Sequence, residues 1–313
     1  MTELTSADFE RLRDIRAHRP DAIGTALATR RRRDVLQGDG RLFIIAADHP
    51  ARGALAVGSD PTAMADRYLL LERLAVALGH PGVDGVLGTP DIVDDLAALG
   101  LLDGKVVVGS MNRGGLRGAA FEMDDRYTGY DVPTLAAKGL DFAKTLVRVN
   151  LADPATVSTL EATARAVDQA AAARLPIMLE PFMSEWRDGR IVNDLSTDAV
   201  ILSTAIASGL GADSAYTWMK LPVVADMERV LAATTLPTLL LGGDSGADPD
   251  ETFAAWEDAL ALPGVRGLTV GRTLLYPPDG DVAAAVDTAA RLVHRELPAA
   301  VRRIPTITEG RIS

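Results

Sequence analysis

The stretch "KTLVRVNLADPATVSTLEATARAVDQAAAARLPIMLEP", residues 144–181, holds two short apolar runs separated by an alanine-rich segment. The runs at 144–150 and 175–181 are rich in Val, Ile and Leu, which is typical of strands buried on both faces of a parallel sheet. The segment between them opens with Asp153-Pro154, an N-cap followed by proline at the first helical position. The stretch therefore predicts a strand–helix–strand unit with parallel strands.

The same alternation runs through most of the chain. Apolar runs stand at 41–48, 83–89, 105–110, 144–150, 175–181, 213–220, 236–243 and 265–272. Two further helix starts are expected at Asp60-Pro61 and Asp248-Pro249. Eight evenly spread units in about 270 residues predict a (β/α)8 barrel, the TIM barrel fold. An open doubly wound sheet is the alternative, but an early G-x-G-x-x-G turn is missing.

The barrel is expected to form a single domain over residues 41–313, since no Gly/Ser-rich or Pro-rich linker divides it. Residues 1–40 predict two extra helices, an N-terminal helical extension. The run "RRRR" at 30–33 is expected to be a solvated helix face rather than a nucleic-acid site. The longest stretch without periodicity, 110–131, follows the third strand, so we expect it to lie over the barrel mouth, where loops carry function.

The composition argues against several classes of function. The 313 residues carry a net charge of −11, with a pI near 4.9, the reverse of what a general nucleic-acid binder shows. Cysteine is absent, so disulfides, thiolate ligands and cysteine nucleophiles are excluded. The first 20 residues lack the apolar core of a signal peptide, and no apolar run approaches the roughly 18 residues that span a membrane. We expect a cytoplasmic protein that binds neither nucleic acid nor a membrane.

Charged side chains stand at the ends of strands that are otherwise apolar, and in a barrel the C-terminal strand ends carry the chemistry. In chain order, the candidates are Asp48, His49, Arg52, Ser110, Asn112, Arg113, Lys144, Arg148, Asn150, Glu180, Lys220, 242–246, Gly271 and Arg272. Because side chains alternate along a strand, Lys144, Glu180 and Lys220 converge if their faces point into the barrel. Arg52 and Arg148 are candidates for binding the substrate.

A lysine in such a cluster has a chemical use. It attacks a carbonyl only as the neutral amine, and its ordinary pKa is about 10.4. A dry wall and a second cation such as Lys144 both favour the neutral form, and bringing the pKa of Lys220 to about 7–8 takes about 4 kcal/mol. The protonated imine that follows stabilises the carbanion left when a C–C bond breaks β to it. Glu180 would then move protons.

Each candidate also has a purely structural interpretation. Lys220 and Glu180 could form a buried ion pair, and Lys144 could be a lysine at the lower rim whose amine reaches out to solvent. Asp48 could be a loop acid, and His49 is more often a structural loop histidine.

The last two strand ends suggest a phosphate site. After the seventh strand, the turn "GGDSG" at 242–246 begins with Gly242 and Gly243 and offers backbone N–H groups unshielded by side chains. In barrels this quadrant often holds phosphate, and after Gly271 the guanidinium of Arg272 adds a fixed cation. A tight turn without a ligand is the structural alternative.

Five motifs follow one another in order along residues 40–280. They are "AADHPARGAL" (46–55), "AKTLVRVN" (143–150), "LEPFM" (179–183), "YTWMKLP" (216–222) and "VGRTLLYP" (270–277). Together they resemble the class I tagatose-1,6-bisphosphate aldolase family, whose members are Schiff-base (β/α)8 barrels. The chain is also similar to aldolase-like barrel proteins of actinobacterial inositol-catabolism clusters.

The resemblance implies a role for each matching residue. Lys220 would form the imine, Glu180 would be the acid/base, and Lys144 would be the neighbouring cation. Asp48 would lie near the carbonyl or hydroxyl end of the substrate, and Arg272 would lie at a phosphate. The strand-seven turn and the strand-four end at 148–150 depart from the family, so the phosphate contacts and the sugar pocket are expected to differ.

These observations predict a class I aldolase that needs no cofactor or metal and cleaves a phosphorylated keto sugar or keto sugar acid. The resemblance implies 2-deoxy-5-keto-gluconate 6-phosphate as a particular substrate, giving dihydroxyacetone phosphate and malonate semialdehyde. One alternative is a magnesium-dependent barrel lyase or isomerase with Glu180, Asp48 and Asp244 as oxygen ligands. Another is a barrel that binds a sugar phosphate without catalysis. The expected partner is a small phosphorylated sugar, and the chain could form a homo-oligomer.

Overall fold

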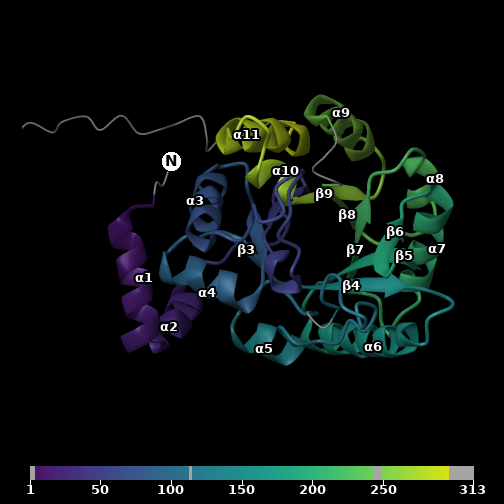
Figure 1. Ribbon diagram of the computed structural model, residues 1–313, viewed down its shortest axis with the longest axis horizontal. Helices are drawn as coiled ribbons and strands as arrows, with labels where there is room; N and C mark the ends of the chain where they lie inside the picture. The colour runs from purple at the N-terminus through teal and green to yellow at the C-terminus, as the bar shows by residue number, and fades with distance from the viewer. Residues whose placement is uncertain (1–3, 113–114, 243–247, 296–313) are drawn as a thin grey trace, which may run out of the picture.

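The computed structural model describes residues 4–112, 115–242 and 248–295. Within them, eight parallel strands close into a barrel (Figure 1): β1 (Leu42–Ala46), β2 (Gly85–Gly88), β3 (Val106–Ser110), β4 (Phe142–Val149), β5 (Ile177–Arg187), β7 (Thr217–Pro222), β8 (Thr238–Leu241) and β9 (Val265–Val270). Each of these strands pairs with the next, and β9 pairs with β1, which closes the ring. The predicted (β/α)8 barrel is confirmed, and all eight predicted strands are present.

Helices cover the outside of the barrel (Figure 1). In the described residues they are α1 (Ser6–His18), α2 (Asp21–Thr29), the short 3-10 helix η1 (Pro50–Arg52), α3 (Arg67–Leu78), α4 (Pro90–Ala98), α5 (Val132–Ala137), α6 (Ala155–Ala173), α7 (Thr197–Ser208), α8 (Met227–Leu231), α9 (Pro249–Leu260), α10 (Arg272–Leu275) and α11 (Val282–Val293). The two expected N-terminal helices are present as α1 and α2, which pack against α4. In the part of the chain that the structure describes, no helix is long and apolar enough to cross a membrane.

Two of the three predicted Asp-Pro helix starts are correct. The Asp248 side chain accepts a hydrogen bond from the backbone N–H of Asp250 as the N-cap of α9, and α6 begins directly after Asp153-Pro154. The prediction at Asp60-Pro61 is wrong. The Asp60 carboxylate accepts hydrogen bonds from the backbone and hydroxyl of Thr62, which stabilises a turn in place of a helix. Helix α3 begins at Arg67 instead, capped by the side chain of Asp66.

The interior of the barrel is filled with apolar side chains up to the level of the strand ends. These inward-facing residues are Leu42, Ile44, Ala46, Leu87, Val106, Val108, Phe142, Met178 and Leu239, all buried. They stand at alternate positions, so the next inward positions on β4, β5 and β7 belong to Lys144, Glu180 and Lys220. Buried apolar side chains therefore fill the barrel directly below the charged groups.

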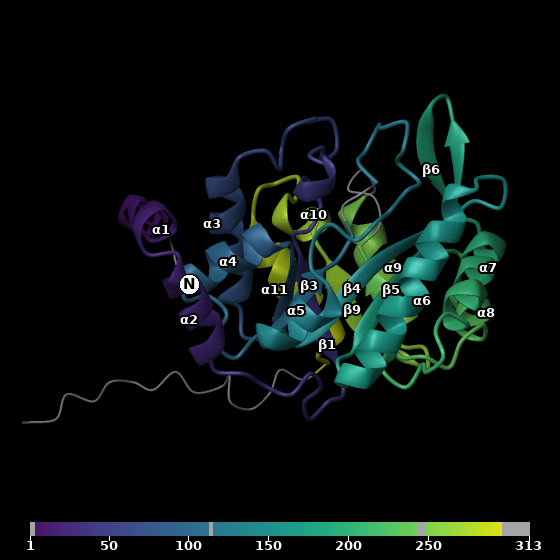
Figure 2. The same cartoon turned by 90° about the horizontal axis from the view of Figure 1, so that it is seen from below.

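A hairpin that the sequence analysis did not predict extends the barrel. Strand β5 continues past the barrel and turns back as β6 (Arg190–Asp194), which pairs with it in antiparallel fashion. The turn residues Asp188 and Gly189 have φ angles of +52° and +73°, the left-handed pair that two-residue hairpin turns require. Figure 2 shows the hairpin projecting beyond the body of the molecule at its upper right.

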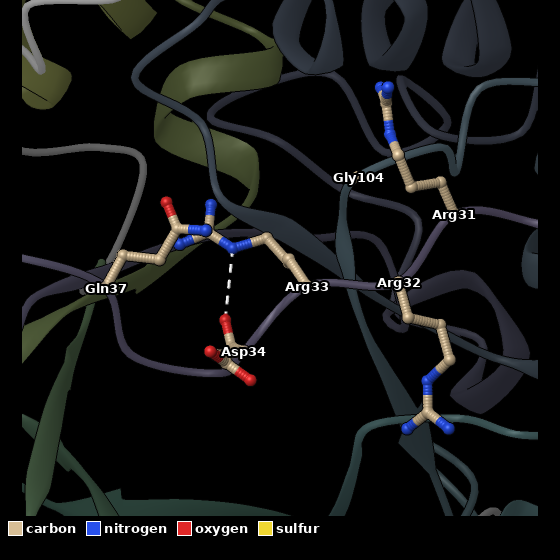
Figure 3. A pocket seen from close by; sticks show the side chains of 6 residues that line it. All are labelled: Arg31, Arg32, Arg33, Asp34, Gln37 and Gly104. Atoms are coloured by element: carbon tan, nitrogen blue, oxygen red, sulfur yellow. Dashed lines mark hydrogen bonds between the residues drawn. The ribbon is translucent and has the colours of Figure 1, made fainter.

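The arginine run 30–33 is not a helix face, because α2 ends at Thr29. Arg30 is buried and donates a hydrogen bond to Asp141, which directly precedes β4. Arg33 pairs with Asp84, which directly precedes β2. The expectation of a helix face is therefore wrong. Arg30 and Arg33 pair with acids at the N-terminal ends of the strands, whereas Arg31 and Arg32 are exposed to solvent. Arg31, Arg32 and Arg33 line a hollow of about 720 Å³ at this end of the barrel. Figure 3 shows that the side chains of these three arginines point away from one another.

Candidate active site

A cavity of about 780 Å³ opens at the C-terminal ends of the barrel strands. The predicted site residues that line it are His49, Arg52, Arg148, Glu180, Lys220, Gly242, Gly271 and Arg272. Asp48 and Lys144 are buried directly behind Glu180 and contact the same cluster. Gly243, Arg113, Asp244, Ser245 and Gly246 lie outside the described residues. The loop after β3 contributes Arg117, Gly118 and Glu122 to the wall, as its predicted place over the mouth requires.

The charged groups form a continuous chain of contacts. The Lys220 Nζ donates to Glu180 Oε1 at 2.5 Å, and the Lys144 Nζ contacts Glu180 Oε2 at 2.5 Å. Lys144 also donates to Asp48 Oδ2 at 3.1 Å, and Ser110 Oγ donates to the same oxygen at 2.8 Å. The prediction that Lys144, Glu180 and Lys220 converge inside the barrel is confirmed, and Asp48 joins them.

Strand register explains why these residues meet. Met178, inside the barrel, lies opposite Lys144 on β4 and Trp218 on β7. Glu180 and Lys220 stand two residues further along their strands, so both point inward one layer above. Sequence positions that are 40 residues apart thereby come within hydrogen-bonding distance.

Burial makes this cluster chemically unusual. Lys144, Lys220 and Glu180 are only 3%, 4% and 8% exposed. Burial by itself would raise the pKa of Glu180, but the adjacent ammonium groups of Lys144 and Lys220 outweigh it and lower that pKa to about 2. For Lys220, burial and the nearby Lys144 lower the pKa of the amine, against the opposing effect of Glu180. Glu180 is therefore ionised, and Lys220 gives up its proton more readily than a solvated lysine.

The opposite wall carries the predicted phosphate contacts. Gly271 leaves no space for a side chain, because a Cβ there would lie 2.2 Å from the carbonyl oxygen of Ala46. The following Arg272 begins α10 and lines the cavity, where one of its Nη atoms lies 3.5 Å from the carbonyl oxygen of Ala56. The guanidinium of Arg52 also lines the cavity and forms no ion pair with any described residue. Phosphate binding here remains a prediction.

Arg148 lies at the cavity, but its guanidinium already has partners. It donates to Glu122 Oε1 at 2.9 Å and to Asp125 Oδ2 at 3.3 Å, both on the loop after β3. A Cβ on Gly115 would lie 2.2 Å from an Arg148 nitrogen, so the loop closes tightly around the guanidinium. These contacts identify Arg148 as the anchor of this loop, and a direct role in substrate binding stays a prediction.

The sequence analysis missed several residues that shape the cavity. The loop acids Glu122 and Asp125 were not assigned to Arg148. The β5–β6 hairpin adds Arg190, Ile191 and Val192 to the wall. A signal for the hairpin was available, since the dipeptide Asp188-Gly189 is a strong marker of a two-residue turn.

Among residues 4–112, 115–242 and 248–295, no three His, Asp or Glu side chains are arranged to hold a metal ion. Two of the three oxygen ligands considered for magnesium, Glu180 and Asp48, contact lysine ammonium groups instead.

Fold and site together define a class: a (β/α)8 barrel with a buried lysine–carboxylate–lysine cluster at its C-terminal strand ends. The chain belongs to the Cgl0159-like family, whose family model matches residues 40–290. It is 71% identical to Cgl0159 from Corynebacterium glutamicum (Brevibacterium flavum), whose crystal structure superimposes with a TM-score of 0.92 over 93% of this chain and 98% of that one. A comparison with curated proteins finds no match.

More distant structures share the fold. A Schiff base forming fructose-1,6-bisphosphate aldolase is 20% identical, with a TM-score of 0.61 over 87% of this chain and 99% of that one. An archaeal fructose-1,6-bisphosphate aldolase, with its catalytic Lys covalently bound to the carbinolamine intermediate of the substrate, gives the same identity, coverage and TM-score. At this level of identity the similarity establishes the barrel architecture.

Proposed function

We propose that this protein is a class I aldolase that cleaves a C–C bond of a phosphorylated keto sugar or keto sugar acid through an imine on Lys220. The observation that carries the proposal is the buried Lys220 amine, which shares the Glu180 carboxylate with Lys144. Such a cluster lowers the pKa of the amine and keeps a proton carrier beside it. The similarity in fold to a Schiff base forming aldolase supports this choice.

The chemistry can be followed atom by atom. The neutral Lys220 amine attacks the substrate carbonyl carbon, and the resulting carbinolamine loses water to give a protonated imine. Glu180 takes the proton from the hydroxyl group on the β carbon, the second carbon from the imine carbon. The bond between the α and β carbons then breaks, and the β carbon becomes that of an aldehyde. The bonding electrons move into the imine to give an enamine. Protonation of the enamine carbon and hydrolysis of the imine release the ketone and restore the amine.

The neighbouring groups have supporting roles in this proposal. Lys144 disfavours a proton on Lys220 and can return a proton through Glu180, since it contacts both Glu180 and Asp48. Asp48 would orient a substrate hydroxyl. Arg272 and Arg52 supply cations for the phosphate on the opposite wall, in a protein whose net charge is −11.

The particular substrate, the pathway, the compartment and the partners are also proposed. The particular substrate would be 2-deoxy-5-keto-gluconate 6-phosphate in inositol catabolism, cleaved in the cytoplasm to dihydroxyacetone phosphate and malonate semialdehyde. The partner would be this small sugar phosphate and not a nucleic acid or a membrane, and a homo-oligomer is compatible with the proposal. No cofactor or metal takes part in the steps above.

Borohydride trapping tests the proposed function. Reduction in the presence of dihydroxyacetone phosphate should add to the protein the mass of the ketone less one oxygen atom, because the imine forms with loss of water and is then reduced. Peptide mapping should place this adduct on Lys220. Lys220→Arg should keep the fold, checked by circular dichroism, and give no adduct. An unchanged mass of the wild type with several ketose phosphates would refute the imine. Thermal stabilisation by the same ligands without turnover would favour a binding protein, and loss of activity in EDTA would favour the magnesium alternative.

A further inference from the structure

His49 differs from the other histidines in how its ring is paired. His18, His80 and His294 each contact at least one carboxylate. The ring of His49 makes no hydrogen bond with any described residue, and its Nδ1 is buried without a partner. This unpaired ring lines the cavity that contains Lys220. Leaving a buried polar atom unpaired costs folding free energy, so the position calls for a functional reason.

The backbone around His49 makes room for the ring. His49 directly follows Asp48, just after the first strand. A Cβ on Gly271 would lie only 3.0 Å from the Cε1 atom of the His49 ring, so the glycine leaves space for the ring. Thr269 on β9 lies opposite Ile44 of β1, which belongs to the apolar interior of the barrel. Thr269 is 1% exposed, its hydroxyl is buried without a partner, and it lines the same cavity. The wall between β1 and β9 thus presents two polar groups that no described residue satisfies.

The ring is uncharged at neutral pH. Burial lowers the pKa of His49 to about 3, aided by the cations of Arg272, Lys220 and Arg52 and opposed by Asp48. An uncharged imidazole has one nitrogen that donates a hydrogen bond and one that accepts. A hydroxyl group also donates and accepts, whereas a phosphate is better matched by the guanidinium of Arg272 on the same wall.

We propose that His49 is a specificity-determining residue that, with Thr269, hydrogen-bonds a hydroxyl group on the carbon next to the imine carbon of the substrate. This inference rests on the proposed imine at Lys220, whose charge is near enough to His49 to contribute to the fall in its pKa. The proposed keto sugar substrates carry such an α-hydroxyl group, and the inference assigns its recognition to the side chains of His49 and Thr269. A ketone that lacks this hydroxyl would offer the His49 ring no such hydrogen bond.

A pair of ketones isolates that hydroxyl. Dihydroxyacetone phosphate and hydroxyacetone phosphate both carry the phosphate and the keto group, and they differ only in the hydroxyl on the other side of the carbonyl. In borohydride trapping, the wild type should reach half-maximal adduct at a concentration on the order of tenfold lower for the hydroxylated ketone, the size expected of one hydrogen bond. His49→Phe should bring the two concentrations together, and His49→Gln should restore part of the preference.

Unphosphorylated dihydroxyacetone is the matched control, because the preference for phosphate over no phosphate should survive in His49→Phe. If His49→Phe keeps the preference for the hydroxylated ketone, this inference alone is overturned. The same holds if His49→Phe loses the preference for the phosphorylated ketone and not the preference for the hydroxyl. Absence of any wild-type adduct would overturn the proposed function and this inference together. If His49→Phe does not fold, Thr269→Val should lower the hydroxyl preference, and an unchanged preference in that variant counts against the inference.

Discussion

At the scale of single residues, the candidate site is organised around one carboxylate that two ammonium groups share. Glu180 contacts Lys144 and Lys220 through different oxygens, both at 2.5 Å. Both lysines are almost entirely buried, so these contacts are largely shielded from water. The carboxylate therefore sets both the charge of the amine and the route by which a proton can leave it.

Replacing Glu180 by Gln separates those two effects. Glu180 opposes the fall in the pKa of Lys220, so Glu180→Gln should lower that pKa further and extend borohydride trapping to lower pH. Proton transfer would be lost, and the rate of cleavage should fall on the order of 100-fold or more. Trapping measured against pH and cleavage of a ketose phosphate check this. Glu185→Gln, on the exposed part of the hairpin, is the control, and an unchanged cleavage rate in Glu180→Gln would contradict the assigned role.

Gly271 offers a test of how tightly the wall beside His49 is built. The Cβ of Gly271→Ala would lie 2.2 Å from the backbone oxygen of Ala46, which cannot move without displacing β1. We expect a loss of about 1–3 kcal/mol in the free energy of unfolding, measured in urea. Gly24→Ala in α2 meets no atom within 4 Å and should gain about 0.5–1 kcal/mol. Equal stability of the two variants would show that the wall is looser than described.

At the scale of elements, Arg148 joins β4 to the loop after β3. Arg148→Met would leave Glu122 and Asp125 buried without their cation, at a cost of about 3–5 kcal/mol. Because these contacts hold the loop over the mouth, amide hydrogen exchange should rise most in residues 115–126. The control is Arg165→Met, which removes an exposed pair within α6 and should change stability by no more than about 0.5 kcal/mol. Uniform exchange across the barrel in Arg148→Met would argue against a local anchor.

The elements also show what the sequence could and could not predict. The barrel strands are buried on both faces, so their composition alone marks them, and the alternation of side chains brings Lys144, Glu180 and Lys220 together. Strand β6 has a half-exposed, mixed composition and carries no comparable signal apart from its turn. The partner of Arg30 could not be predicted, because Asp141 lies 111 residues away and only the closed barrel brings the two together.

At the scale of the whole molecule, a second charged cluster joins the segment before the barrel to the residue that follows the last helix. His294, directly after α11, contacts Asp39 Oδ2 at 2.5 Å and Asp84 Oδ2 at 3.1 Å. Asp84 also pairs with Arg33 and accepts a hydrogen bond from the backbone of Phe43. The segment before the barrel, the base of β2 and the last helix are thus held by shared side chains.

This cluster predicts a pH-dependent stability. Burial would lower the pKa of His294, but hydrogen bonds and charges from Asp84 and Asp39 outweigh it and raise that pKa. Because the pKa is raised in the folded state, the charged histidine stabilises the fold fully below the ordinary pKa of about 6.5. This stabilisation is lost as the pH rises through the pKa of the folded state. The difference in melting temperature between wild type and His294→Gln should therefore be largest near pH 6 and shrink at higher pH. His18→Gln, at an exposed histidine, is the control, and a difference independent of pH would contradict the assignment.

The arginines at the base of the barrel have one more consequence. Arg30 and Arg33 come from outside the eight repeated units, yet they neutralise acids at the entrances of β2 and β4. A truncation that starts at residue 41 would strip both carboxylates of these counter-charges, so the leading segment and the barrel should melt as one cooperative unit. For protein engineering, the loops at the barrel mouth and the β5–β6 hairpin are the parts to vary in search of new substrates. Residues 30–33 should be kept in every variant that contains the barrel.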